Sequence, residues 1–344
     1  MQTNTDRKQS TATLLEPINI GGVIVDVPLF FAPMAGASDF PARAIAREQG
    51  AGLCISEMVT SQTHLWHTKK SKYRLPTEKD PEPRPIQIAG TDPSEMAEAA
   101  KRCVDMGAGL IDINMGCPAK KVCRRAAGSA LLGDEALIGN IVEAVVNAVP
   151  VPVTLKTRTG LNPTSKNVVR VAQLVESLGI QALTIHGRTR ACRFNGEAEY
   201  ETIAQVVEET TLPIIANGDI TTPEKAQWVL QKTNAAGLMI GRGAWGKPWL
   251  FRQIHAQING APIPQPAPQD IGAILVQHLH LLYAEYDEQQ AVKFARKHVD
   301  RYLTDWDPEN IFRRDFNQLT SPAAQLMTLE HFFNRLCEKH TQAA

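Results

Sequence analysis

The strongest constraint on the fold is a regular alternation of short apolar runs with amphipathic stretches. Eight runs of strand length lie between residues 29 and 241, and helix-like stretches separate them. They occupy residues 29–33, 52–56, 85–89, 110–114, 151–156, 182–186, 213–217 and 237–241. Such alternation is typical of a (β/α)8 TIM barrel, which takes roughly 250 residues. The sequence therefore predicts an α/β fold of this kind.

Residues at the ends of the amphipathic stretches support this interpretation. Asp92-Pro93 and Thr222-Pro223 are typical helix starts, and Gly107 and Gly179 are typical of the position just after a helix. An open doubly wound sheet is the competing architecture. It would carry a glycine-rich dinucleotide fingerprint after an early strand, and residues 33–36 (Pro-Met-Ala-Gly) do not form one.

The remaining segments divide the chain into regions. We expect a flexible N-terminal tail at residues 1–16 and a barrel domain at 17–258, which opens with a hairpin turning at Gly21-Gly22. Residues 259–268 are a proline-rich linker, and residues 269–344 contain only helical patterns. The sequence thus predicts a small all-helical C-terminal domain after the barrel.

Composition excludes several classes of protein. The 36 Lys and Arg residues balance 36 Asp and Glu residues, which excludes a protein that coats nucleic acid through a large net charge. A hydrophobic content of 43% excludes global disorder. With no apolar run of membrane-spanning length and no signal sequence, we expect a cytoplasmic monomer without membrane contact. Six cysteines without a Cys-x-x-Cys pair predict reduced thiols and no metal site.

Polar side chains gather where the predicted strands end. Because active sites of barrels lie at the carboxyl ends of the strands, these residues are candidates for a site. They are Gln87, Asn114, Lys156, His186, Asn217 and Arg242. The last two strands end in the glycine-containing turns 217–219 and 241–243, which predict a phosphate site made by backbone N–H groups. Alternatively, these glycines only serve tight turns, Lys156 extends to solvent, and His186 is a core histidine.

One cysteine stands out by its position. Cys117 follows Gly116 just beyond a strand end, so it lies on a loop over the predicted site. A thiol with an ordinary pKa near 8.5 is mostly protonated at neutral pH and can act as an acid.

Positive charge gathers on the loops around the predicted mouth. Lys120 follows the fourth strand and Arg188 follows the sixth, and each has further basic neighbours. In the second domain, helical spacing places Lys293, Lys297 and Arg301 on one face. A neutral protein with this pattern suits a polyanion that reaches into the mouth. The alternative for the last helix is a solvated face, because Asp300 and Asp305 lie close by.

The motifs at the strand ends resemble one family. Asn-Met-Gly-Cys-Pro at 114–118 and His-Gly-Arg-Thr at 186–189 are its most specific elements, and the resemblance runs over about residues 17–250. Further segments are 32–36, 87–90, 128–132, 154–158, 216–219 and 241–249. Together they resemble the flavin-dependent tRNA-dihydrouridine synthases, in particular the bacterial B-type. The helical domain is similar in architecture and, more weakly, in sequence at residues 295–298.

The resemblance implies a role for each residue of the site. Pro33, Met34 and Ala35 would pack on the ring system of FMN, while Gln87 and Lys156 would bond its polar edge. The residues implied around the phosphate are His186, Asn217, Gly218, Asp219, Gly241 and Arg242. Asn114 and Arg158 would hold the target uracil, and Cys117 would be the proton donor.

The resemblance also implies the reaction and the partners. Reduced flavin would deliver a hydride from N5 to C6 of a uracil in tRNA, Cys117 would protonate C5, and NADPH or NADH would reduce the flavin again. The target base must leave its stack to reach the flavin. The basic residues that we expect to hold the tRNA are Lys120, Arg188, Lys293, Lys297 and Arg301.

Three other functions remain open on sequence. A flavin barrel could act on a free pyrimidine, as a dihydroorotate-type oxidoreductase does. The chain could be an RNA-binding barrel without catalysis. It could also be a phosphate-binding isomerase or aldolase without flavin, in which Lys156 forms a Schiff base.

Overall fold

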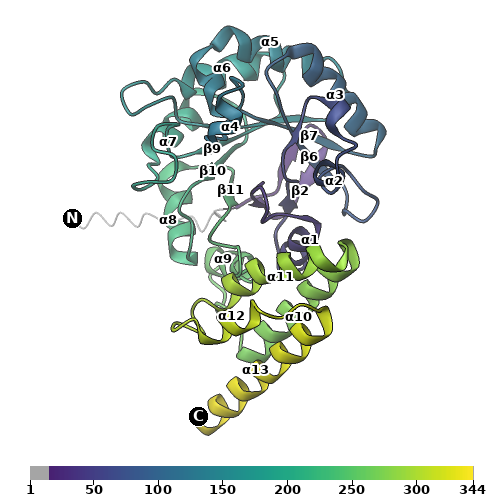
Figure 1. The fold of residues 1–344 in the computed structure, drawn as a ribbon. Helices are drawn as coiled ribbons and strands as arrows, with labels where there is room; N and C mark the ends of the chain where they lie inside the picture. Colours follow the sequence, from purple (N-terminus) through teal and green to yellow (C-terminus); the bar gives the residue numbers. More distant parts are fainter. Residues whose placement is uncertain (1–14, 344) are drawn as a thin grey trace, which may run out of the picture.

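The computed structural model describes residues 15–343, and these form a closed parallel barrel with a helical C-terminal region (Figure 1). Nine strand segments run in the order β4-β3-β11-β10-β9-β8-β7-β6-β5. Their bounds are Leu29–Phe31 (β3), Leu53–Cys54 (β4), Val59–Thr60 (β5), Pro85–Ala89 (β6), Leu110–Asn114 (β7), Val153–Arg158 (β8), Ala182–His186 (β9), Ile214–Asn217 (β10) and Gly237–Ile240 (β11). The predicted barrel is confirmed. The tail predicted at residues 1–16 lies outside the described residues, except for its last two.

The second predicted strand differs from expectation. Instead of one run at 52–56, the chain forms β4, bends, and resumes as β5, so the two segments are halves of one barrel strand. In the bend, the Ser56 N–H donates to the Pro85 carbonyl at 3.1 Å, and the Ser56 hydroxyl accepts the Gln87 N–H at 3.1 Å. Glu57 accepts the Gly36 N–H at 2.7 Å. One backbone bond and two side-chain bonds thus replace the regular ladder in the bend, and the apolar pattern of the run gives no sign of them.

Two apolar layers hold the barrel together. Because successive strand residues face opposite sides, Phe30 packs inside the barrel while Phe31 packs outside, edge-on against Phe251 of the outer helix α9 (Leu250–Ile258). The predicted hairpin is present as β1 (Ile18–Ile20) and β2 (Val23–Val25). It places Ile20 in the interior layer, with residues from the amino ends of the strands. The hairpin therefore closes one end of the barrel and leaves the carboxyl ends open for a site.

The outer helices begin where the sequence predicted. Asp92 caps α3 (Pro93–Asp105) by accepting the Glu95 N–H at 2.8 Å, and Thr222 caps α8 (Pro223–Thr233) by accepting the Lys225 N–H at 3.1 Å. The other long helices of this layer are α1 (Phe40–Glu48), α5 (Glu135–Val146), α6 (Val168–Ser177) and α7 (Glu201–Glu209). Between β5 and β6 the described chain has only short turns, η1 (Thr63–Leu65) and α2 (Lys69–Lys72). Two further short turns, α4 (Lys120–Cys123) and η2 (Gly128–Gly133), follow β7.

The C-terminal region has its own core. It consists of α10 (Pro268–Glu285), α11 (Glu288–Leu303), α12 (Ile311–Phe316) and α13 (Pro322–Ala343); the short α12 had no clear pattern in the sequence. Their buried faces form one apolar cluster, which Tyr73 and Trp249 of the barrel join. Figure 1 shows these helices gathered on one side of the barrel, beside α1 and α9. No helix within residues 15–343 is long and apolar enough to cross a membrane.

A buried polar cluster joins the two regions. Asp39, which caps α1, lies 3.6 Å from His298 Nε2 of α11, and His278 packs beside it. Among the described residues these are the one group of three side chains spaced closely enough to share a metal ion. The Trp245 indole, however, donates to His298 Nδ1 at 3.4 Å, so this nitrogen acts as an acceptor and the ring presents an N–H at Nε2 toward Asp39. This arrangement fits a contact between the two regions better than a metal site.

Candidate active site

A cavity of about 840 Å³ opens at the carboxyl ends of the strands. It lies within the size range of small-molecule and cofactor sites. Most of the residues predicted for the site line it, namely Pro33, Met34, Ala35, Gln87, Asn114, Cys117, Lys120, Lys156, Arg158, His186, Asn217, Gly218, Asp219, Gly241, Arg242 and Arg301. Arg188, Lys293 and Lys297 do not. The fold thus brings residues that are widely separated in the sequence, from Pro33 to Arg301, to one cavity.

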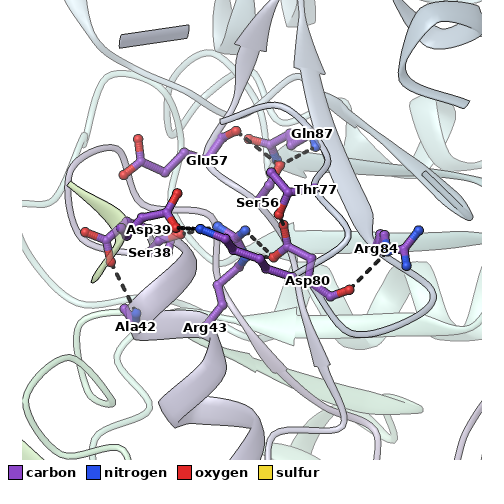
Figure 2. A network of polar contacts seen from close by, with 12 residues as sticks. Ser38, Asp39, Ala42, Arg43, Ser56, Glu57, Thr77, Asp80, Arg84 and Gln87 are labelled. Atoms are coloured by element: carbon purple, nitrogen blue, oxygen red, sulfur yellow. Dashed lines mark hydrogen bonds and ion pairs between the residues drawn. The ribbon is translucent and has the colours of Figure 1, made fainter. Parts of the chain in front are cut away.

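The loop after β3 forms an apolar side of the cavity. Residues 33–35 lie there, and the loop is fixed from beneath. Met34 N–H donates to the Ser38 hydroxyl at 2.7 Å. Figure 2 shows Arg43 between Ser38 and Asp80: its guanidinium donates to the Ser38 carbonyl at 2.9 Å and pairs with the Asp80 carboxylate. This buried ion pair and the Ser38 hydrogen bonds hold the loop, which presents an apolar surface to the cavity.

Lys156 places an amine inside the cavity. It lies on β8, and its Nζ donates to Asn217 Oδ1 at 3.0 Å. Burial, helped by the nearby Arg158, lowers the pKa of Lys156 to about 8. The amine is therefore still mostly protonated at neutral pH, at a lower pKa than an exposed lysine, and it has donors left for a ligand.

Backbone crowding shapes the part of the cavity wall that follows β10 and β11, which we call the cradle. A Cβ on Gly218, whose φ is +131°, would lie 2.7 Å from Ala198 Cβ, and a Cβ on Gly243 would lie 2.2 Å from the Ile220 carbonyl. Both positions therefore need glycine. Within the described chain, no protein acceptor is recorded for the backbone N–H groups of Arg242 and Gly243. Free N–H groups on tight glycine turns are typical of phosphate sites.

Neighbouring charges make this cradle suitable for an anion. The Asp219 carboxylate pairs with Arg188 at 2.6 Å and with Arg242 at 3.5 Å. Although burial raises the pKa of Asp219, these cations hold it below its ordinary value. Burial and the nearby Lys156 keep the pKa of His186 well below its usual range, so its ring is neutral. The net charge facing a ligand here is positive.

Arg188 is not where sequence reasoning placed it. Its guanidinium is only 3% exposed and donates to Asp219 and to the carbonyls of Asn195 and Gly196. It therefore lies beneath the cradle and fixes the loop after β9, rather than standing at the rim. A position in the sequence next to a strand end does not tell on which side of the loop a long side chain packs.

A chain of amide groups connects the strands to the Cys117 loop. Asn114 Oδ1 accepts the backbone N–H groups of Gly116 at 3.3 Å and Cys117 at 3.1 Å. Asn114 Nδ2 donates to Gln87 Oε1 at 2.8 Å, and Gln87 Nε2 donates to Asp112 at 2.7 Å. Asn114 therefore positions the Cys117 loop in addition to lining the cavity.

The Cys117 thiol is placed to carry a proton. It lies in the cavity wall, and burial raises its pKa, so the thiol stays protonated at neutral pH. Its own carbonyl accepts from the Ser129 hydroxyl at 3.0 Å and from Cys123 Sγ at 3.5 Å. Cys123 thus supports the loop from behind, while Cys117 faces the cavity.

Arg158 is largely committed to the protein. Its Nε donates to the Gly116 carbonyl at 2.7 Å, and its Nη1 donates to the carbonyls of Thr189 and Arg193 at 3.1 and 2.8 Å. It therefore ties the Cys117 loop to the loop after β9. A direct role in uracil binding, as the resemblance implies, is left to its remaining nitrogen.

Sequence reasoning missed two aromatic residues at the mouth. Phe194 lines the cavity and is 53% exposed, with the guanidiniums of Arg158 and Arg242 at 5.4 and 5.0 Å from its ring. Trp245 also lines the cavity, and the Arg301 guanidinium lies over its ring, 4.6 Å from the centroid. An exposed aromatic residue among arginines on a loop was the available signal for Phe194.

The predicted basic face of α11 divides into different roles. Lys293 is exposed, and Arg301 is exposed at the cavity mouth. Lys297 instead donates to the Gly36 carbonyl and lies 3.7 Å from Asp39. It therefore links the C-terminal region to the loop beside the apolar wall. Lys120 is exposed beside Cys117.

Solved structures of low sequence identity share the barrel. One is a 2-naphthoyl-CoA reductase complex, with a TM-score of 0.56 and 12% identity over 73% of this chain and 53% of that one. Another is the old yellow enzyme homologue from Zymomonas mobilis, with a TM-score of 0.52 and 14% identity over 76% of this chain and 96% of that one. At such identity the likeness supports the fold alone.

Sequence relatives are much closer. The chain is 49% identical to tRNA-dihydrouridine synthase B of Pseudomonas syringae pv. tomato over 94% of this chain and 96% of the relative. It is 51% identical to the protein of the same name from Salmonella typhimurium over 89% and 95%. Residues 30–337 match the dihydrouridine synthase (Dus) family. The chain therefore belongs to the dihydrouridine synthase family.

Proposed function

We propose that the chain reduces uridines in tRNA to 5,6-dihydrouridine in this cavity, with FMN as the bound flavin and NADPH or NADH as the reductant. Membership of the family makes it an oxidoreductase that acts on tRNA uridine and uses a flavin. The observation that carries the proposal is the pairing of an anion cradle at one end of the cavity with a neutral thiol, Cys117, in its wall. The cofactor, the reductant and the residue roles are the proposed part.

The residues present fit FMN. The cradle at Gly218, Arg242 and Gly243 suits one phosphate group, and no room for a side chain exists at either glycine. The apolar loop at residues 33–35 suits the face of a flat ring system. Lys156 is placed to form a hydrogen bond with the polar edge of that ring. Its amine is buried, and the residue lies on β8, paired with Asn114 of β7.

In the proposed reaction the protein holds the uracil in place and supplies the proton. A bound reduced flavin supplies the hydride for C6 of the uracil, and NADPH or NADH supplies the electrons. Cys117 Sγ gives its proton to C5 and is reprotonated from solvent, so that one hydride and one proton complete the saturated bond. Asn114 has an N–H left to hold a uracil carbonyl oxygen, where negative charge develops.

The mouth suits a nucleic acid. We assign tRNA binding to Lys120 and Arg301 at the opening, to the exposed Lys293 on the same helix as Arg301, and to the aromatic Phe194, on which a base can stack. Residues 17–258 are then the FMN domain and residues 269–344 the tRNA-binding domain. One chain carries all these groups, so we propose a monomer that acts in the cytoplasm.

An anaerobic half-reaction tests the proposal. Holoenzyme reduced with NADPH is mixed with unmodified tRNA, while the visible flavin band and dihydrouridine are followed together. We expect the flavin to be reoxidised in step with dihydrouridine, and heat to release FMN. Reoxidation by free uracil or orotate but not by tRNA would instead support the free-pyrimidine oxidoreductase. A protein that takes up no flavin would refute the proposal.

A further inference from the structure

The amide chain beneath the active site ends on a buried carboxylate. Asp112 lies on β7, two residues before Asn114, and is fully buried without lining the cavity. One carboxylate oxygen accepts from Gln87 Nε2 and the other from the Thr154 hydroxyl, each at 2.7 Å. None of the roles described above uses this residue.

The two ends of this chain of amides determine which group donates and which accepts in each of its hydrogen bonds. At the upper end, the backbone N–H groups of Gly116 and Cys117 can only donate, so Asn114 must turn its oxygen toward them. The Asn114 amide nitrogen then donates to Gln87, which must accept through its oxygen. Gln87 therefore presents its nitrogen to position 112, where only an acceptor can satisfy it.

An ionised carboxylate is the side chain best suited to that end. A primary amide such as Gln87 or Asn114 can rotate by half a turn at little cost in shape, which would exchange its donor and acceptor. A carboxylate cannot donate, so a flipped Gln87 would place two acceptors 2.7 Å apart. Burial raises the pKa of Asp112, but the two donors and the nearby Lys156 favour its charged form.

We propose that Asp112 is a positioning residue for the reaction: through Gln87 it fixes the orientation of Asn114, so that the cavity is offered amide N–H donors rather than carbonyl oxygens. The inference rests on the proposed function. The orientation of the Asn114 amide makes the site selective for a base with a carbonyl oxygen at the position that Asn114 contacts. It also holds the Cys117 loop, because the same amide bonds the Cys117 N–H.

Three variants separate this role from a general structural one. Asp112→Leu removes the acceptor with little change in volume, while Asp112→Asn keeps an acceptor and removes the charge. Thr154→Val is the matched control, because it removes the other donor to Asp112 and leaves the link to Gln87 intact. Flavin-loaded proteins are compared in the two half-reactions, reduction by NADPH and reoxidation by tRNA over a range of tRNA concentrations.

We expect Asp112→Leu to lower the limiting rate of reoxidation about 100-fold, the usual effect of a small misplacement of a reacting group. The tRNA concentration at half saturation and the rate of reduction by NADPH should stay within about threefold, a split that general unfolding would not give. Asp112→Asn should recover at least tenfold of the loss, and Thr154→Val, which keeps the link to Gln87, should stay within about threefold of the wild type.

Two outcomes would overturn the inference: a wild-type limiting rate in Asp112→Leu, or an Asp112→Asn protein that is as slow as Asp112→Leu. If Asp112→Leu does not fold, a loss well above about tenfold in Asp112→Asn, against a nearly normal Thr154→Val, overturns it as well. A wild-type enzyme that tRNA cannot reoxidise would refute the proposed function, which is a separate result.

Discussion

Lys156→Met should stabilise the cofactor-free protein, because burial of the Lys156 ammonium lowers the free energy of unfolding of the wild type. The pKa of Lys156 falls from 10.5 to about 8, and such a difference corresponds to about 3 kcal/mol. The hydrogen bond to Asn217 is lost in the variant and offsets about 1 kcal/mol. We therefore expect the variant to gain about 2 kcal/mol in its free energy of unfolding at neutral pH.

The gain should depend on pH in a defined direction. Between pH 8 and 10.5 the unfolded chain holds the lysine proton more tightly than the folded one, so wild-type stability from this group rises through that window. The advantage of Lys156→Met is then full below about pH 8 and shrinks above it. Urea unfolding of both proteins without flavin, at several pH values, measures this difference.

A matched control and a functional readout complete the test. Lys101→Met changes an exposed lysine on α3 and should leave the unfolding free energy within about 0.5 kcal/mol. Lys156→Met should also bind FMN more weakly. A variant that is less stable than the wild type at neutral pH, or whose advantage does not change with pH, would refute the reasoning.

Three further predictions concern the cavity and its rim. Cys117→Ala should keep FMN and its reduction by NADPH, but should lower dihydrouridine formation by about 10²–10⁴ in stopped-flow half-reactions. The control Cys123→Ala should lower it far less. Equal rates of reoxidation in both variants would show that Cys117 is not the acid. Gly243→Ala should lose FMN during purification, since its Cβ would meet the Ile220 carbonyl at 2.2 Å, and a fully loaded variant would argue against the cradle. Lys293→Glu should weaken tRNA binding and flatten its salt dependence by about one unit of slope or more, compared with Lys101→Glu in a filter-binding assay; identical slopes would exclude a phosphate contact.

The sequence predicted those parts of the site that strand geometry alone decides. Gln87, Asn114, Lys156, His186 and Asn217 all lie on parallel strands of one closed barrel, so their order along the chain was enough to bring them to one cavity. The place of the cradle followed from the same argument, because Gly218 and Gly243 lie in the turns after the last two strands. The fold class needed only the alternation of apolar runs and helix ends.

What the sequence could not predict depends on where long side chains turn. Arg188 and Lys297 follow the basic pattern of the rim, yet each bonds backbone carbonyls of the barrel. The role proposed for Asp112 depends on its hydrogen bonds to Gln87 and Thr154 on neighbouring strands, and its place in an apolar run gave no sign of them. Such pairings require the register of the sheet, which no single sequence displays.

The most direct test of the central claim is to map dihydrouridine in tRNA from cells that lack this protein. The account predicts that dihydrouridine is lost at one or more tRNA positions. The wild-type chain should restore it, and an equally abundant Cys117→Ala variant should not. Unchanged dihydrouridine at every position in the deletion strain would contradict the account, and so would full restoration by Cys117→Ala.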